Sequence, residues 1–275
     1  MVKVGVVATD YCFGNDAIGE HGLTILIETK EGKLLFDTGQ GLALGYNLAA
    51  LGWNLSGLEC IAISHGHNDH TGGLLEALKL CGDREIPVYG HKDIFAERFK
   101  VSPKGEAPTG CPFTREELEA TGARFIFNDK PLELLPGIML TGPIQRGFSE
   151  TAGKSHFIVE NKQRVPDPFR DDQALVLTTK KGIVIIYGCA HAGVINTMDH
   201  VEKITGEKKF YALLGGTHLL QADQGVLEKT LGQIEKRGVE VLGFTHCTGL
   251  NAIAYFNTHF SGKNYDASTG FSIEI

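Results

Sequence analysis

The chain has 275 residues, of which 42% are hydrophobic and 21% are charged, and this composition excludes a disordered tail or a collagen-like repeat. Asp and Glu number 33 against 26 Lys and Arg, so the formal charge is −7, which argues against binding nucleic acid by neutralising its phosphates. No apolar run reaches the roughly 18 residues of a membrane helix, so we expect no membrane partner.

The first seven residues of the chain (MVKVGVV) predict a strand and not a signal peptide. The six cysteines are scattered along the chain without a CxxC pair, which predicts reduced thiols and not a disulfide framework. We therefore expect a cytoplasmic globular protein.

Two later segments share one pattern. Residues 24–39 (TILIETKEGKLLFDTG) and 174–189 (ALVLTTKKGIVIIYGC) each hold two apolar runs around a Thr-Lys-x-Gly turn, which is typical of a β-hairpin. Two similar hairpins predict two similar halves. Between them, residues 43–51 and 74–80 have helical spacing.

Residues 92–172 are the least regular part of the chain. They hold most of the prolines and several basic side chains, with short hairpin-like strands at 124–127 and 132–141. We expect this range to form an irregular insertion or lid over a site, within a single domain that spans residues 1–275.

In the second half, helical segments alternate with apolar runs. The helical segments are 196–205, 225–236 and 250–259, and the runs at 210–214 and 239–244 are typical of buried strands. The pattern predicts the α/β class, as an αββα sandwich of two mixed β-sheets with outer helices.

The strongest motif, SHGHNDHTGG, directly follows the apolar run 60–63. It contains an HxHxDH cluster formed by His65, His67, Asp69 and His70. Imidazole nitrogens and carboxylate oxygens suit zinc, iron or manganese, and four such ligands in six residues can flank a pair of ions. A polar loop of hydrogen-bonded histidines is the ordinary alternative, but it does not account for three imidazoles at one strand end.

Three more histidines stand just after apolar runs and near glycine: His191, His218 and His246. Sites in α/β folds are assembled at strand ends, and flanking glycines let the backbone approach a ligand closely. We interpret His191 and His246 as metal ligands. For His218 the sequence favours neither a site role nor an ordinary packing role.

Asp37 ends the first hairpin, beside Thr38 and Gly39. A carboxylate there would accept a hydrogen bond from a ligating histidine and fix its tautomer, whereas the alternative is an Asp that caps the turn. The other histidines lack the strand-end context, and we predict that they lie at the surface: His21, His91, His156, His200 and His259. For His156 a place in the lid is the alternative, because it falls within that range.

These motifs together resemble the metallo-β-lactamase superfamily across essentially the full chain: LLFDTG, the HxHxDH cluster and the strand-end histidines. The combination SHGHNDHTGGL, GCAHAGVINT, GGTHL and HCTG is similar to the branch of the dihydropterin-ribofuranosylaminobenzene-phosphate synthases, many of whose members are known only as metal-dependent hydrolases. The resemblance implies a dinuclear site with two divalent metal ions, with zinc expected and iron or manganese as alternatives.

By this resemblance, His65 and His67 would bind one ion, and Asp69, His70 and His246 would bind the second. His191 is our candidate for the third ligand of the first ion.

The chain departs from the usual family pattern at two places. Typical members have a separate histidine before the strand at 174–179, where this chain has Asp171 or Asp172. They have an Asp or Cys after the next strand, where this chain has Cys189 or His191. His191 could therefore occupy the bridging position instead, and Asp171, Asp172 and Cys189 are reserve ligands.

The function that we expect is hydrolysis of a small phosphorylated or ester-like substrate by a metal-bound hydroxide. Asp69 would orient the hydroxide and His218 would give a proton to the leaving group, with Asp37 as the supporting carboxylate. The chain contains no GxSxG elbow, so we expect no serine nucleophile.

Transfer is the alternative, because the branch implies condensation of a dihydropterin diphosphate with a ribosylated aminobenzene phosphate. Arg146 could hold a phosphate through its guanidinium, and His218 could contact the substrate. A non-catalytic, metal-containing ligand sensor ranks third, and a di-iron redox protein, which would need a flavin partner, ranks fourth. We expect a small-molecule substrate and no nucleic acid.

Overall fold

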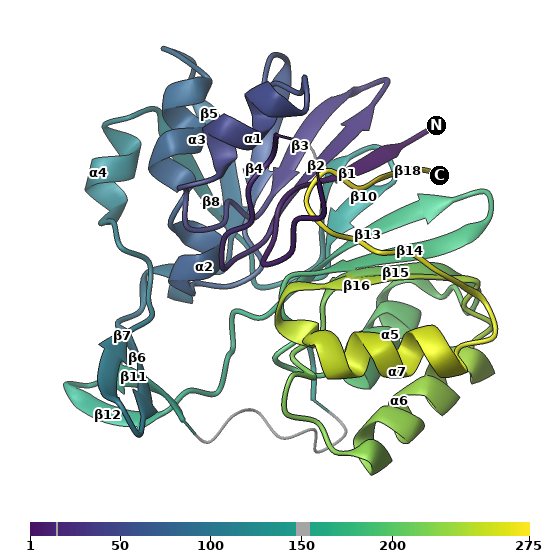
Figure 1. Cartoon of the computed structure of the whole chain (residues 1–275). Helices are drawn as coiled ribbons and strands as arrows, with labels where there is room; N and C mark the ends of the chain where they lie inside the picture. Colours follow the sequence, from purple (N-terminus) through teal and green to yellow (C-terminus); the bar gives the residue numbers. More distant parts are fainter. Residues whose placement is uncertain (15, 147–154) are drawn as a thin grey trace.

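Two seven-stranded β-sheets lie face to face at the centre of the molecule, and helices cover their outer sides (Figure 1). This computed structural model describes residues 1–14, 16–146 and 155–275. The αββα sandwich that the sequence predicts is confirmed. No helix in the described ranges is long and apolar enough to cross a bilayer.

The first sheet has the strand order β18-β1-β2-β3-β4-β5-β8. β2 and β3 form an antiparallel hairpin, and β3, β4, β5 and β8 then run parallel. The strands are β1 (Lys3–Ala8), β2 (Thr24–Thr29), β3 (Gly32–Phe36), β4 (Leu58–Ala62), β5 (Ile86–Gly90), β8 (Ala123–Phe127) and β18 (Ser272–Glu274).

The second sheet repeats this plan, with the order β17-β16-β15-β14-β13-β10-β9. β13 and β14 form the antiparallel hairpin, and β14, β15, β16 and β17 run parallel. The two similar sequence segments therefore start two similar sheets. The strands are β9 (Leu132–Leu135), β10 (Ile138–Leu140), β13 (Ala174–Thr179), β14 (Gly182–Tyr187), β15 (Phe210–Gly216), β16 (Val241–Thr245) and β17 (Lys263–Asn264).

The hairpin strands are apolar at successive positions because both of their faces are buried. On β2, Ile25 and Ile27 point between the sheets, where they share one core with Leu175 of β13, whereas Leu26 points outward. The outward side chains of the first sheet pack against α1 (Leu44–Ala50) and α3 (Leu74–Leu80).

Three longer helices cover the outer face of the second sheet (Figure 1): α5 (Val194–Thr205), α6 (Gln224–Lys236) and α7 (Leu250–His259). Gly206 ends α5 with φ 73°, a left-handed conformation that suits glycine. The Asp223 carboxylate begins α6 by accepting a hydrogen bond from Val226 N at 2.9 Å.

The described parts of the range 92–172 contribute strands to three sheets. β8 joins the edge of the first sheet, and β9 and β10 join the edge of the second. The remaining strands form a separate four-stranded sheet of order β12-β11-β6-β7, at the lower left of Figure 1. They are β6 (Arg98–Ser102), β7 (Gly105–Pro108), β11 (His156–Glu160) and β12 (Gln163–Pro166), and the short helices η1 (Lys92–Phe95) and α4 (Arg115–Glu119) also lie in this range.

Candidate metal centre

The HxHxDH motif forms the loop after β4 and the one-turn helix α2 (Asn68–Thr71). His65 and His67 lie on the loop, while Asp69 and His70 lie in the helix. Gly66 between the two histidines passes so close to η1 that a Cβ there would lie 2.5 Å from Ile94 O. The glycine thus lets the loop press against the neighbouring segment and turn both imidazoles to one side.

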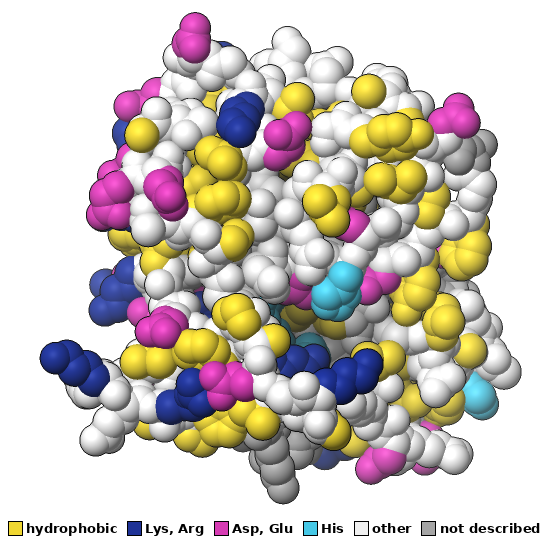
Figure 2. All heavy atoms as spheres, turned by 60° about the vertical axis from the view of Figure 1, so that its left-hand side comes forward, with side chains coloured by type: hydrophobic (Ala, Val, Ile, Leu, Met, Phe, Trp, Pro, Cys, Tyr) yellow, Lys and Arg dark blue, Asp and Glu magenta, His cyan; other side chains and the backbone are white. Residues whose placement is uncertain are grey.

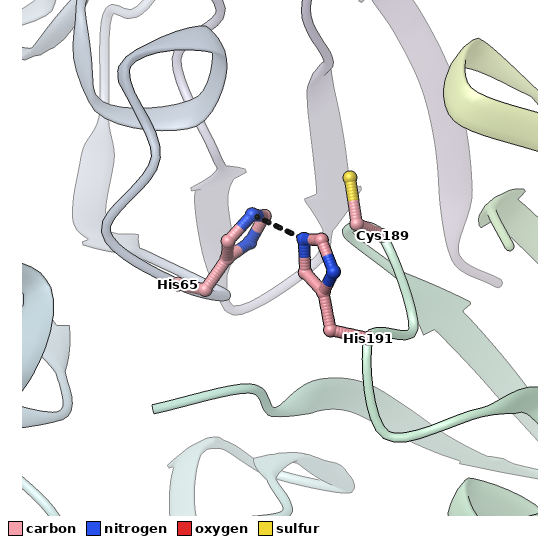
Figure 3. Close-up of side chains that lie close together, drawn as sticks. All are labelled: His65, Cys189 and His191. Atoms are coloured by element: carbon pink, nitrogen blue, oxygen red, sulfur yellow. Dashed lines mark hydrogen bonds between the residues drawn. The ribbon is translucent and has the colours of Figure 1, made fainter. Parts of the chain in front are cut away.

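Three imidazoles converge in the first cluster. His65 Nε2 lies 3.0 Å from His67 Nδ1. It also lies 3.2 Å from His191 Nε2, the contact drawn as a dashed line in Figure 3. All three rings are buried, and burial lowers the pKa of each well below its usual range. Neutral imidazoles present lone pairs, and nitrogen atoms so close together need a shared proton or a cation.

A second cluster joins the helix α2 to the end of β16. Asp69 Oδ2 lies 3.5 Å from His246 Nε2 and 3.9 Å from His70 Nε2. Burial raises the pKa of Asp69, but the charges of His70 and His246 outweigh it and hold that pKa well below its usual range. An ionised carboxylate together with two imidazoles is a ligand set that suits a divalent cation.

Cys189 lies between the two clusters. Its Sγ belongs with His65 and His191 to one group of ligand atoms within 4.8 Å of one another, and with His70 and His246 to another such group. His70 Nε2 lies 3.1 Å from this Sγ. Burial raises the pKa of the Cys189 thiol well above its usual range, so a metal ion would be needed to deprotonate it. Sequence reasoning named Cys189 only as a reserve ligand.

The other two reserve ligands are engaged elsewhere. Asp171 Oδ2 accepts a hydrogen bond from Gly66 N at 2.8 Å, and Asp171 Oδ1 pairs with Arg98 Nη2 at 2.8 Å. Asp172 Oδ2 accepts from Ala192 N at 2.6 Å. Neither carboxylate belongs to a possible metal-binding group in the described part of the chain, and by the same 4.8 Å criterion neither do His67 and Asp69.

Asp37 and Ser64 fix two of the imidazoles from outside. Asp37 Oδ2 lies 2.7 Å from His70 Nδ1 and accepts a 2.7 Å hydrogen bond from Ser64 Oγ. Ser64 Oγ in turn lies 2.9 Å from His65 Nδ1. With both Nδ1 atoms used in this way, His65 and His70 present Nε2 toward the cluster. The sequence predicts such a hydrogen bond from a candidate metal-binding histidine to Asp37, and the contact with His70 is of this kind.

His218 and Arg146 lie at the edge of the clusters. The His218 ring centroid is 4.5 Å from that of His191. Arg146 Nη2 donates to His191 O at 3.2 Å. Phe169 stacks on the other side of His191, with ring centroids 4.1 Å apart and an interplanar angle of 5°. Figure 2 shows a hollow on this face with a histidine at its rim and Lys and Arg side chains along its lower edge.

Backbone strain gathers at the same place. Seven non-glycine residues in the described ranges have a positive φ, a conformation that is costly for residues with a Cβ. Five of these lie around the two clusters: Asp37, Phe169, Ala190, His218 and His246. Such concentration supports a functional site.

Sequence reasoning missed two residues here. Asp10 follows β1 by two positions, and its Oδ1 lies 2.7 Å from His21 Nδ1. His21, predicted to be a surface histidine, has a side chain that is 62% exposed, and its Nε2 also lies 3.4 Å from Asp69 Oδ2. The strand-end rule that found His191 and His246 could have found Asp10 as well.

The surface prediction is wrong for three other histidines. His91, His156 and His200 are all buried. His91 Nδ1 accepts from Asp93 N in η1, and His200 Nε2 lies 3.2 Å from Thr141 O. The His156 ring lies 5.3 Å from that of His67. His259 is exposed, as predicted.

The metallo-β-lactamase superfamily model matches residues 17–246. A curated relative from Methanocaldococcus jannaschii, 7,8-dihydropterin-6-methyl-4-(β-D-ribofuranosyl)-aminobenzene-5′-phosphate synthase, is 33% identical over 94% of this chain and 92% of its own. A crystal structure described as a metal-dependent hydrolase of the β-lactamase superfamily superposes with a TM-score of 0.87 at 30% identity, covering 100% of this chain and 99% of the other. The metallo-β-lactamase fold protein YhfI from Bacillus subtilis, at 18% identity and a TM-score of 0.62, covers 100% of this chain and 99% of its own and shows the shared fold.

Proposed function

The chain belongs to the metallo-β-lactamase superfamily, and from that premise we propose that it is a metal-dependent hydrolase acting on a small phosphorylated or ester-like substrate. The observation that carries the proposal is a pair of donor groups that share Cys189, one with His65 and His191 and the other with His70 and His246. Nitrogen, oxygen and sulfur donors of this kind fit zinc, with iron or manganese as alternatives.

The residues divide between two ions. Two bound divalent cations would supply Lewis acidity, which lowers the pKa of water and neutralises charge on a leaving oxygen. The first ion would be held by His65, His67 and His191, the second by Asp69, His70 and His246, with Cys189 between them.

The chain's own side chains prepare the site for this chemistry. Asp37 and Ser64 hold His70 and His65 by their Nδ1 atoms, so the ligand atoms are oriented before any ion arrives. The carboxylate of Asp69 would orient the attacking water. Burial lowers the pKa of His218 to about 4, so this imidazole beside His191 is neutral and would donate an N–H hydrogen bond to the leaving group.

An anionic substrate is favoured by Arg146. Its guanidinium is fixed against His191 O and lies 6.0 Å from the centre of the Phe169 ring. A cation anchored beside the site can bind a phosphate.

The described cysteines are all free thiols, which supports a cytoplasmic location.

A transferase that uses the same ions is the second candidate. The synthase name of the 33% identical relative favours it. Product analysis separates the two reactions. Release of acid or phosphate without an acceptor supports hydrolysis, whereas turnover only with an arylamine acceptor supports transfer.

The test is metal content and turnover in matched variants. We expect about two ions per chain by elemental analysis of protein purified without a chelator. His67→Ala should lose turnover of a phosphoester probe and bind less metal, while the control His259→Ala, on the exposed end of α7, should match the wild type. One ion or none after reconstitution would refute the proposal and favour a ligand sensor. Full activity in His67→Ala would also refute it, because turnover would then not depend on this ligand.

A further inference from the structure

Asp10 connects two histidines that are distant in the sequence. Its Oδ2 lies 2.5 Å from His246 Nδ1, and its Oδ1 lies 2.7 Å from His21 Nδ1. Each carboxylate oxygen of Asp10 therefore faces one ring nitrogen, from which it can accept a hydrogen bond.

The contacts close into a ring through Asp69. His21 Nε2 lies 3.4 Å from Asp69 Oδ2, and His246 Nε2 lies 3.5 Å from the same oxygen. Two carboxylates and two imidazoles thus alternate around the ring. Two of its members, Asp69 and His246, are ligands of the second ion in our proposed function.

The part of the loop that leads into His21 is anchored at Ile18 and Glu20. Asn47, fully buried in α1, donates to Val7 O at 2.9 Å and to Ile18 O at 2.8 Å, and it accepts from Ile18 N at 2.8 Å. The Glu20 carboxylate accepts from Ala43 N at 3.0 Å at the start of α1. His21 is therefore exposed on a backbone that its neighbours hold in place.

Directly after His21, the chain contacts residues 65–70, the metal loop, which carries the four side chains of the HxHxDH motif. Gly22 has φ 146°, and a Cβ there would lie 2.5 Å from Asp69 O. Leu23 N donates to the same carbonyl at 3.2 Å. Only a residue without a side chain allows this approach, which brings the His21 ring against the Asp69 carboxylate.

The cluster of Asp10, His21 and His246 is a group that could hold a metal ion by distance alone, but its hydrogen bonds argue against this. Each oxygen of Asp10 accepts from an imidazole N–H. A ring nitrogen that carries a proton has no lone pair for a cation. His246 has two nitrogens, and the one that faces Asp10 leaves Nε2 for the second ion.

We propose that Asp10 and His21 are positioning residues of the second metal site, an inference that rests on the proposed function. Asp10 orients His246 through its Nδ1–H, in the way that Asp37 orients His70. His21 links that carboxylate to Asp69, so two of the three proposed ligands of the second ion are held by one outer pair. Groups that hold metal ligands from outside typically change metal affinity by about 10–100-fold.

The experiment measures the affinity of each ion separately. Apo protein is titrated with Zn²⁺ against a chromophoric chelator, and with Co²⁺ by absorption spectroscopy. Asp10→Ala should weaken one of the two ions by about 10–100-fold and leave the other unchanged. Asp10→Asn keeps one oxygen acceptor for His246 and should lose less, and His21→Ala should weaken the same ion.

Asp16→Asn is the matched control, since it removes the same charge from an exposed position of the same loop and should bind both ions as the wild type does. Equal affinities in Asp10→Ala and wild type would overturn the inference. So would an equal loss for both ions together with a lower melting temperature of the apo protein. If Asp10→Ala does not fold, the affinities of the two ions are compared between the isosteric Asp10→Asn and the wild type instead. A wild-type protein that binds fewer than two ions would refute the proposed function instead.

Discussion

Replacing Arg98 with Met tests how the separate four-stranded sheet supports the metal loop. Arg98 lies at the start of β6, and only 2% of the residue is exposed to solvent. Its guanidinium lies 2.8 Å from both Asp167 Oδ2 and Asp171 Oδ1. Asp171 also accepts from Gly66 N at 2.8 Å, between the first two histidines of the motif. Arg98→Met would therefore leave two buried carboxylates without their cation.

The expected cost is large. Removing one partner of a buried ion pair destabilises a protein by about 3–5 kcal/mol, because a buried charge remains. The total stability of a domain is about 5–15 kcal/mol. At about 2–4 °C per kcal/mol for a large domain, the melting temperature should fall by about 10 °C. The exposed pair of Arg124 with Glu85 at 2.9 Å gives a control, since Arg124→Met should cost less than about 1 kcal/mol.

The pH dependence separates a charge effect from a packing effect. Burial raises the pKa of Asp171, and Arg98 opposes that rise. Without Arg98 the folded-state pKa rises further, so the folded variant binds more protons than the unfolded chain, and its stability increases as the pH falls. Urea unfolding should give a smaller deficit at pH 5 than at pH 8. A deficit that is equal at both values, or one below 1 kcal/mol, would refute the reasoning.

Three further substitutions test the supports of the site. Gly188→Ala would push a Cβ into the Ser64 side chain, so we expect a loss of about 1–3 kcal/mol in urea unfolding; an unchanged midpoint would contradict the described contact. Asn47→Leu removes three hydrogen bonds of a buried side chain and should cost at least about 2 kcal/mol in the same assay, with the exposed Asn54→Leu as a comparison. Cys189→Ser should abolish the thiolate-to-metal absorption of the Co²⁺ protein, and a retained band would assign the thiolate to another cysteine.

The sequence predicts the parts of the site that are local. His65, His67 and His70 lie within six residues of one another, so their convergence follows from one strand end. Cys189 is harder to choose from sequence, because a buried thiol and a ligand look alike. Its place between the clusters depends on how the two sheets face each other.

Two of the three wrong surface predictions for histidines have one physical origin. His156 and His200 are buried by contacts that local patterns do not reveal. His156 lies on β11, which pairs with β6 at a distance of over 50 residues, and His200 contacts Thr141 beyond β10. Pairing between distant segments is set by tertiary packing. The halves, in contrast, follow from hairpins that are themselves local.

The division of the proposed metal ligands between the two sheets has a further consequence. His65, His67, Asp69 and His70 follow β4 of the first sheet, whereas Cys189, His191 and His246 follow strands of the second. Bound ions would therefore cross-link the halves of the sandwich at one end. An ion that binds only the folded chain stabilises it by mass action. A chelator would therefore lower the stability of this protein by removing the link between its two sheets.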